Sequence, residues 1–140
     1  MKDKSKANRG KKLEKLIDDT NQLYKELQLA SVEKIPTPVK IMSVNGGRVS
    51  GVKQRGYIVD YLGVIDGHAI AFDAKETAAK SFPLSNLHKH QFEMLQRWHD
   101  KGASAFLVVH FTEYGEYYYL DYITLYWYWK QVENGGRKSI

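Results

Sequence analysis

Residues 68–76 read His68-Ala69-Ile70-Ala71-Phe72-Asp73-Ala74-Lys75-Glu76, and this stretch decides the fold. Side chains of a β-strand point alternately to its two faces, so Ile70, Phe72 and Ala74 are predicted to face a core. Asp73 and Lys75 share the opposite face, which is otherwise lined by alanine, and we expect open space in front of them. On its own, this pair indicates either a surface salt bridge or a catalytic site.

The preceding segment supplies a second carboxylate. Residues 57–63 are predicted to form a strand that is joined to residues 67–76 by a turn at Asp66-Gly67. Asp60 in this strand is expected near Asp73, and two neighbouring carboxylates repel each other unless a cation lies between them. Oxygen ligands suit Mg²⁺, and Lys75 beside the ion would stabilise the charge that develops on a phosphate. These residues favour a site for metal-assisted phosphodiester hydrolysis.

A helix is predicted to begin after the N-cap Ser85 and to end near Lys101-Gly102. Gln91 lies on the apolar stripe of this helix, where a buried amide needs hydrogen-bond partners, so it is either a satisfied core residue or a ligand. His88 and His90 point elsewhere and are expected at the surface or near phosphates. A zinc site is not expected, because the chain has no cysteine and no further histidine at zinc spacing. The expected buried face of the helix consists of Leu87, Met94, Leu95 and Trp98.

The N-terminal part combines a helix with a basic hairpin. Helical periodicity from Arg9 to Leu29 predicts an amphipathic helix, with Glu14 on the flank of its apolar stripe, a position that can face a cleft. Pro36-Thr37-Pro38 predicts a rigid extended connector. Strands at 39–44 and 48–57 around Asn45-Gly46-Gly47 predict a tight hairpin that projects from the core. The expected inward stripe of the helix consists of Leu13, Leu16, Ile17, Thr20, Tyr24 and Leu27.

The remaining elements are an apolar strand at 103–111, a strand at 117–120 and a helix at 123–132. Together with the elements above, they predict an α/β domain with a mixed sheet and helices packed on it. The last part of the chain is rich in aromatic residues, which would serve as core, as a subunit interface or as platforms for stacked bases. These residues are Tyr117, Tyr118, Tyr119, Tyr122, Tyr126, Trp127, Tyr128 and Trp129.

Charge is unevenly distributed along the 140 residues, which carry 21 Lys and Arg against 16 Asp and Glu. Residues 1–15 hold seven bases and two acids, and residues 34–59 hold five bases and no acid. Two basic segments on a nearly neutral body favour a polyanion partner such as nucleic acid, although a solvated tail and a basic loop would give the same pattern. The lack of cysteine excludes disulfides and thiol chemistry, and no apolar run reaches the length of a membrane span. We expect one soluble, cytoplasmic domain with no membrane contact and no organic cofactor.

Several short motifs, in a fixed order, resemble one known family. The Asp60…Asp73-x-Lys75 pattern is similar to the active site of PD-(D/E)xK nucleases, and the chain as a whole resembles the RecU Holliday junction resolvases. The superfamily pattern alone is weak, whereas the ordered set over roughly residues 8–112 is specific. The set consists of Asn8-Arg9-Gly10 followed by Glu14, Lys34-Ile35-Pro36-Thr37-Pro38, Asp60-Tyr61-x-Gly63, Phe72-Asp73-Ala74-Lys75-Glu76-Thr77, Ser81-Phe82-Pro83-Leu84 and His88-Lys89-His90-Gln91.

The resemblance implies a restriction-endonuclease-like mixed sheet flanked by helices, and a homodimeric, Mg²⁺-dependent endonuclease for which Mn²⁺ is a substitute. Such an enzyme nicks four-way DNA junctions symmetrically during homologous recombination and DNA repair. By this resemblance, Asp60, Asp73 and Gln91 match metal ligands. Lys75 matches the residue that stabilises the transition state, and Glu14 matches an acidic catalytic residue of the first helix. The basic hairpin matches a stalk that enters the junction, and the expected DNA contacts are Arg9, Lys40, Arg48, Lys53 and Arg55.

We expect residues 1–140 to form a single nuclease domain, with a mobile basic arm at 1–8, a stalk hairpin at 39–56, a catalytic core at 57–112 and an aromatic C-terminal segment at 113–140. Two residues depart from the family pattern, because Asp73 replaces the usual Glu and Ile58 replaces a metal-binding Thr. The chain is also shorter than a typical cellular member, which leaves open a phage-type version. Two other functions stay open: a related nuclease for duplex or flap DNA, and a non-catalytic module that binds junctions.

Overall fold

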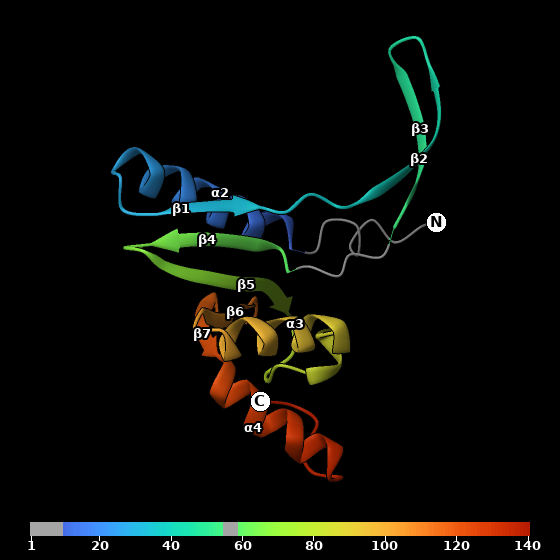
Figure 1. Cartoon of the computed structure of the whole chain (residues 1–140). Helices are drawn as coiled ribbons and strands as arrows, with labels where there is room; N and C mark the ends of the chain where they lie inside the picture. The colour runs from blue at the N-terminus through green and yellow to red at the C-terminus, as the bar shows by residue number, and fades with distance from the viewer. Residues whose placement is uncertain (1–9, 55–58) are drawn as a thin grey trace.

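A mixed five-stranded sheet forms the centre of the protein, whose computed structural model describes residues 10–54 and 59–140 (Figure 1). The strand order is β1-β4-β5-β6-β7; β5 and β6 are parallel, and the other neighbours are antiparallel. Its strands are β1 (Ser31–Lys34), β4 (Tyr61–Ile65), β5 (His68–Thr77), β6 (Ser104–Phe111) and β7 (Glu116–Asp121). The helices are α2 (Lys11–Glu26), α3 (Lys89–Asp100) and α4 (Tyr122–Glu133), with a 3₁₀ turn, η1 (Leu84–Asn86). The predicted α/β arrangement is confirmed.

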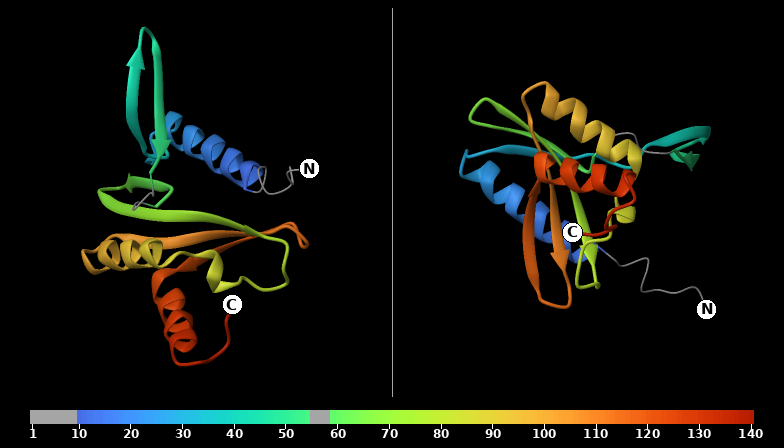
Figure 2. Two further views of the ribbon diagram at one scale, coloured as in Figure 1. Left: turned by 90° about the vertical axis from the view of Figure 1, so that its right-hand side faces the viewer. Right: turned by 90° about the horizontal axis from the view of Figure 1, so that it is seen from below.

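Helices cover both faces of the sheet, with α2 on one side and α3 and α4 on the other (Figure 2). Under α2, Leu13 and Ile17 pack against Tyr61, Ile70 and Phe72. The ring of Phe72 stacks between two other rings, with centroids 4.8 Å from Tyr61 and 4.7 Å from Phe106. A larger cluster on the opposite face contains Val59, Ala71, Leu95, Leu107 and Leu125. Alternation along β5 therefore places residue 73 on the α3 side and residue 72 on the α2 side.

Helix α2 buries less of its apolar stripe than its periodicity predicts. Leu13 and Ile17 are buried, but Leu16, Tyr24 and Leu27 are 46%, 39% and 58% exposed. The helix is also shorter than the predicted 9–29, because it begins at Lys11 and ends at Glu26, and Gln28 then adopts a φ of 56° that a helix cannot continue. Only the first two turns of the stripe carry residues that are fully buried.

Strand β1 was not expected from the sequence. It is short and exposed except at Val32, so its polar residues give no alternating signal. It pairs antiparallel with β4, and Gly63 lies opposite Val32. A Cβ at Gly63 would lie 2.6 Å from the carbonyl oxygen of Ser31, so this close pairing requires glycine.

Helix α3 begins three residues later than predicted. Ser85 is not its N-cap but lies in η1, and Leu87 is extended (φ −102°, ψ 121°), which separates η1 from the helix. The N-cap is His88, whose backbone N–H donates a hydrogen bond of 3.0 Å to Oε1 of Gln91. The buried face consists of Phe92, Met94 and Leu95, while Leu87 is buried ahead of the helix and Trp98 is only partly buried.

The predicted basic hairpin is a separate two-stranded sheet of β2 (Val39–Asn45) and β3 (Arg48–Lys53), which projects away from the main sheet (Figure 1). Gly46 has a φ of 60°, as the predicted turn at Asn45-Gly46-Gly47 requires. Every residue of both strands is exposed. The hairpin therefore contributes nothing to the core, and it is free to contact a partner.

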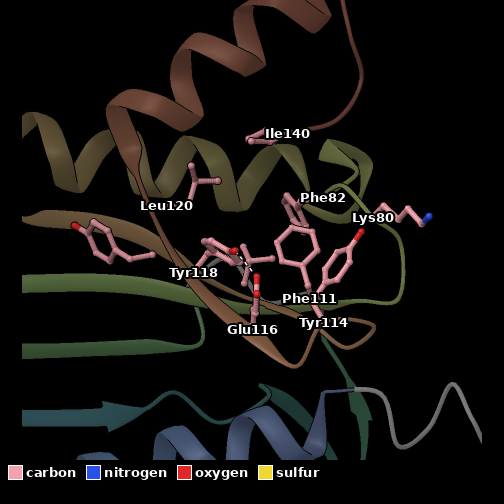
Figure 3. Close-up of a pocket in the computed structure, with 10 residues that line it drawn as sticks. Lys80, Phe82, Phe111, Tyr114, Glu116, Tyr118, Leu120 and Ile140 are labelled. Carbon is pink, nitrogen blue, oxygen red and sulfur yellow. Dashed lines mark hydrogen bonds between the residues drawn. The ribbon is translucent and has the colours of Figure 1, made fainter.

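The aromatic C-terminal segment divides between core and surface. Tyr122 is buried, and the Trp129 ring stacks on Phe92 with centroids 4.3 Å apart. Tyr117 and Tyr119 on the edge strand β7 are 50% and 63% exposed. Tyr114, Phe111 and Phe82 line an aromatic cavity of about 520 Å³ beside this strand, in which the Tyr118 hydroxyl donates to the Glu116 carboxylate (Figure 3). None of the described helices is long and apolar enough to cross a membrane.

Candidate active site

Two carboxylates meet where β4 and β5 pair. Tyr61 is opposite Phe72 in the antiparallel register, which brings the preceding Asp60 beside the following Asp73. The backbone N–H of Asp60 donates a hydrogen bond of 2.8 Å to Oδ1 of Asp73. In return, Oδ2 of Asp60 accepts a hydrogen bond of 3.2 Å from the backbone N–H of Ala74. The two side chains are therefore held together by the strand pair itself and lie on one side of the sheet.

Asp73 is fully buried, which corrects the expectation of open space in front of it. The helix α3 covers this part of the sheet, and the sulfur of Met94 even accepts a hydrogen bond of 3.2 Å from the N–H of Val59. Burial, followed by repulsion from the Asp60 carboxylate, raises the pKa of Asp73 to about 7. Oδ2 of Asp73 is buried and accepts no hydrogen bond from any residue in 10–54 or 59–140.

Lys75 lies next to that oxygen and is positioned by Gln91. Its Nζ is 4.0 Å from Oδ2 of Asp73 and donates a hydrogen bond of 3.1 Å to Oε1 of Gln91. The same Gln91 oxygen accepts the His88 N–H at the start of α3, so both of its lone pairs are used. Gln91 thus connects the helix N-terminus to the lysine, and a role as a metal ligand would require it to exchange one of these bonds.

Glu14 reaches the site from α2 but is held by a second lysine. Its Oε2 lies 3.0 Å from Nζ of Lys34, at the end of β1, and Asp18 lies 3.8 Å from the same amine. Asp18 also accepts a hydrogen bond of 3.1 Å from the Tyr61 hydroxyl, which lies under α2. Burial and the neighbouring Asp18 raise the pKa of Tyr61, which stays a neutral donor.

A polar cleft of about 450 Å³ opens beside Lys75 and gives this amine access to solvent. Glu14 lines it from α2, and Lys75 and Glu76 line it from β5. Oε2 of Glu76 is hydrogen-bonded to Nδ1 of His110 at 3.0 Å, and its Oε1 accepts a hydrogen bond of 3.4 Å from the backbone N–H of Gly10. The cleft therefore gives a ligand access to the Lys75 amine, while Asp73 itself is enclosed.

The donor set fits a hard divalent cation. A buried carboxylate oxygen without a hydrogen bond is unfavourable by itself, and a cation between Asp60 and Asp73 would satisfy it and remove their repulsion. The described residues contain no group of three or more His, Asp or Glu side chains arranged for a metal. Two carboxylates with water and phosphate oxygens as further ligands match the way Mg²⁺ is usually bound.

Comparison with known proteins assigns the chain to a family. The family model "RecU: Recombination protein U" matches residues 8–140. The chain belongs to the RecU family. It is 40% identical to the Holliday junction resolvase RecU of Bacillus mycoides, over 96% of this chain and 70% of that protein. It is 41% identical to the protein of the same name from a Geobacillus species, over 96% of this chain and 70% of that protein.

A solved structure offers a more distant likeness. The Holliday junction resolvase Hjc from Archaeoglobus fulgidus matches with a TM-score of 0.45 and 12% sequence identity, and the match covers 73% of each chain. The RecU family match includes all the described site residues and both strands of the hairpin.

The sequence predicted that Asp60, Asp73, Lys75 and Gln91 lie together, and the structure places them in contact. Their catalytic and metal-binding roles stay predictions. The sequence gave no role to Lys34. That residue stood in a quoted motif, but its approach to Glu14 depends on the unexpected strand β1. On the hairpin, the predicted DNA contacts Lys40, Arg48 and Lys53 are all exposed. The predicted arm at 1–8 and the residues Arg9, Arg55 and Ile58 lie outside the described residues.

Proposed function

We propose that this RecU protein is a Holliday junction resolvase, a Mg²⁺-dependent endonuclease that introduces symmetrical nicks in four-way DNA junctions during recombination and repair. The observation that carries this proposal is the Asp60–Asp73 pair. Oδ2 of Asp73 is buried, accepts no hydrogen bond from the part of the chain that the structure describes, and lies 4.0 Å from the Lys75 amine. Its relatives, at about 40% identity, are named Holliday junction resolvases. Mn²⁺ has similar oxygen-ligand preferences and should substitute for Mg²⁺. Such a substrate implies that the protein acts in the cytoplasm.

The roles of the residues follow from their contacts. Asp60 and Asp73 would hold the cation, which when bound supplies Lewis-acid stabilisation of the phosphate and acidifies an attacking water. Lys75 donates from its amine to a phosphate oxygen on which negative charge develops. Gln91 keeps that amine directed toward the carboxylates through its 3.1 Å hydrogen bond. Glu14, on the rim of the cleft, is positioned to accept a proton from water.

The projecting hairpin would bind the junction. Lys40, Arg48 and Lys53 are exposed on it, and the sequence between residues 34 and 59 contains no acid. Basic side chains that contact phosphates fix the position of DNA without reading its sequence. The hairpin projects beyond the sheet (Figure 1), as a stalk that enters the open centre of a four-way junction would have to do. Arg9 and Arg55 are proposed as additional phosphate contacts.

A homodimer would supply the second active site. Resolution by two symmetrical cuts needs two sites related by a twofold axis, and a C₂ dimer provides them. Exposed aromatic residues on β7 and α4, including Tyr119 and Trp127, are suitable for a subunit interface. Sedimentation equilibrium of the full chain tests this part: a monomer at micromolar concentration, with and without junction DNA, would contradict it.

A nicking assay on a synthetic four-way junction tests the function. With Mg²⁺, the wild-type protein should cut two strands of like polarity at symmetrical positions, and cutting should require the divalent ion. Asp73→Ala and Lys75→Ala should reduce cutting by at least about 100-fold and keep junction binding, because they remove chemistry and not the hairpin contacts. Lys80→Ala, an exposed lysine after the same strand, is the matched control and should cut normally.

Linear duplex and flap substrates, run in parallel, separate the two rival functions. Faster cutting of duplex or flap DNA than of the junction would replace this proposal with the related nuclease. Junction binding that is insensitive to Mg²⁺, with no cutting of any substrate, would replace it with a binding module. Lys75→Ala cutting at the wild-type rate would remove the proposed catalytic centre.

A further inference from the structure

The polar cleft beside Lys75 has one wall that the chemistry described above does not use. This wall is formed by η1 and the start of α3, and it presents Ser85, Asn86 and His88 to the cleft. The opposite wall carries Glu14 and Glu76. The cleft therefore extends the reactive centre to one side, beyond the lysine and toward the N-terminus of α3.

The η1 wall is rigidly supported. Phe82, Leu84 and Leu87 are 1%, 3% and 2% exposed, so buried anchors flank the exposed polar residues. The C-terminal residues hold this loop from behind, because Phe82 and Ile140 exchange two backbone hydrogen bonds of 2.7 and 2.9 Å. Leu84 N–H donates to the carbonyl oxygen of Lys138 at 3.0 Å. Figure 3 shows Phe82 and Ile140 on neighbouring segments. Rigid support of this kind is typical of a preorganised binding surface.

The polar cleft contains hydrogen-bond donors that are available to a ligand, whereas its carboxylates are already paired within the protein. The side chains of Ser85 and Asn86 make no hydrogen bond with any residue in the described ranges. The His88 ring stacks on His90, with centroids 5.5 Å apart, and takes part in a capping box with the backbone N–H of Gln91, which leaves its second ring nitrogen available to a ligand. By contrast, Glu14 is paired with Lys34, and Glu76 accepts from His110 and from Gly10. A hydroxyl, an amide and an imidazole beside a lysine amine form a donor-rich surface, which suits a phosphate oxygen.

We propose that Ser85, Asn86 and His88 bind a DNA phosphate next to the scissile one. This inference rests on the proposed function, because a strand whose scissile phosphate lies at Lys75 must continue past the metal-binding carboxylates on one side. The polar cleft begins at Lys75 and extends toward η1 and the start of α3, so it offers one path for that strand. Contacts to the sugar–phosphate backbone hold the strand in register, irrespective of its sequence. The three residues are positioning residues, since they touch the substrate away from the reacting atoms.

A chemical double-mutant cycle tests this contact. Junctions are prepared in which single phosphates around the cut site are replaced, one at a time, by neutral methylphosphonates. The wild-type protein should lose about 10-fold in cutting rate at one phosphate adjacent to the scissile one, as expected for hydrogen bonds to a charged group. The Ser85→Ala/Asn86→Ala/His88→Ala protein should be about 10-fold slower on the unmodified junction and lose nothing more at that phosphate. The Ser85→Ala/Asn86→Ala/His88→Gln protein should recover part of the rate that the triple alanine variant loses, because the glutamine amide also donates a hydrogen bond.

A matched control lies at the opposite end of the sheet. Nε2 of His68 is 2.8 Å from the Ser104 hydroxyl, beside a different cavity. The His68→Ala/Ser104→Ala protein should keep the wild-type rate and the wild-type sensitivity to methylphosphonate. Thermal unfolding of both variants checks that they fold. Each variant keeps the backbone N–H of residue 88, which donates a hydrogen bond to Gln91 in the wild type.

The outcomes separate this inference from the proposed function. If the triple variant cuts at the wild-type rate, or if its loss and the methylphosphonate loss multiply independently, the phosphate contact is wrong although the resolvase activity stands. If the wild type cuts no junction, the proposed function fails, and the same cycle is read from fluorescence anisotropy of junction binding in a chelator. In that binding cycle, the losses in affinity caused by the triple variant and by each methylphosphonate are compared. If they are independent at every phosphate, the inference is also overturned.

Discussion

Asp60 and Asp73 are joined by a hydrogen bond of 2.8 Å from the backbone of the first to the carboxylate of the second. This bond uses one oxygen of Asp73 for structure and leaves the other buried without a hydrogen bond from the described residues. A carboxylate in that position is destabilising when ionised and metal-free, and stabilising when a cation is bound. The stability of the protein should therefore report directly on the state of the site.

Ionisation of Asp73 should make the metal-free protein less stable as pH rises. The pKa of Asp73 is about 7 in the folded protein, against 3.8 for an unperturbed aspartate. Between these two pH values, the folded state holds a proton that the unfolded state has lost. Stability then falls as pH rises from about 4 to about 7, by on the order of a few kcal/mol. Asp73→Asn should flatten the dependence of the unfolding free energy on pH in this range. At pH 8, in the presence of a chelator, it should also make the protein more stable than the wild type, as measured by urea unfolding.

Asp66→Asn is the control for this measurement. Asp66 lies in the exposed β4–β5 turn with a φ of 49°, a conformation that asparagine adopts readily. The pH profile of Asp66→Asn should match that of the wild type. An Asp73→Asn profile as steep as the wild-type profile would show that another group causes the pH dependence.

Divalent ions should stabilise the folded protein at pH 8. A ligand that binds only the folded state raises the unfolding free energy by about 2.7 kcal/mol at a hundredfold excess over its Kd. The midpoint of thermal unfolding should therefore rise with added Mg²⁺ in the wild type, and not in Asp60→Asn or Asp73→Asn. An equal rise in all three proteins would mean that the ion binds elsewhere.

Gln91→Met should weaken catalysis more than stability. It removes the acceptor for Lys75 at 3.1 Å and for the His88 N–H at 3.0 Å. Loss of the cap should cost about 1 kcal/mol of unfolding free energy, whereas the freed lysine should lower the single-turnover nicking rate by about 10-fold or more. Gln91→Glu retains an acceptor oxygen for both donors, and it should recover the stability.

Gln22→Met provides the comparison for the Gln91 variants. Gln22 lies on the exposed face of α2, and its amide contacts only Glu26 among the described residues. Its substitution should leave the nicking rate unchanged. If Gln91→Met cuts at the same rate as Gln22→Met, Gln91 does not position Lys75.

The carboxylate pair was predictable because it depends on local geometry. Strand alternation and one turn at Asp66-Gly67 are enough to bring Asp60 beside Asp73. The burial of Asp73 was not predictable in the same way, since it depends on where α3 packs, and the start of α3 is set by an extended Leu87 that no local signal marks. Long-range pairings of weakly patterned segments are the parts that sequence reasoning misses.

Strand β1 is the clearest example of such a pairing, and Gly63 tests it. A Cβ at Gly63 would lie 2.6 Å from the Ser31 carbonyl oxygen and 2.8 Å from Cγ2 of Val32, so Gly63→Ala must displace the edge strand. We expect a loss of about 1–3 kcal/mol in urea unfolding. Gly47→Ala has open space around its Cβ and should cost much less. Equal losses in the two variants would show that the close pairing does not contribute.

The hairpin charges should control the salt dependence of junction binding. Each phosphate contact that is removed lowers the slope of log K against log[salt] by about 0.9 for duplex arms. The triple variant Lys40→Ala/Arg48→Ala/Lys53→Ala should therefore bind the junction with a slope smaller by about 2 to 3, while its unfolding free energy stays unchanged because all three residues are exposed. Lys101→Ala, at the exposed end of α3, should leave the slope as in the wild type. A triple variant with the wild-type slope would move the DNA contact away from the projecting strands, and would leave their basic residues without a role in the junction complex.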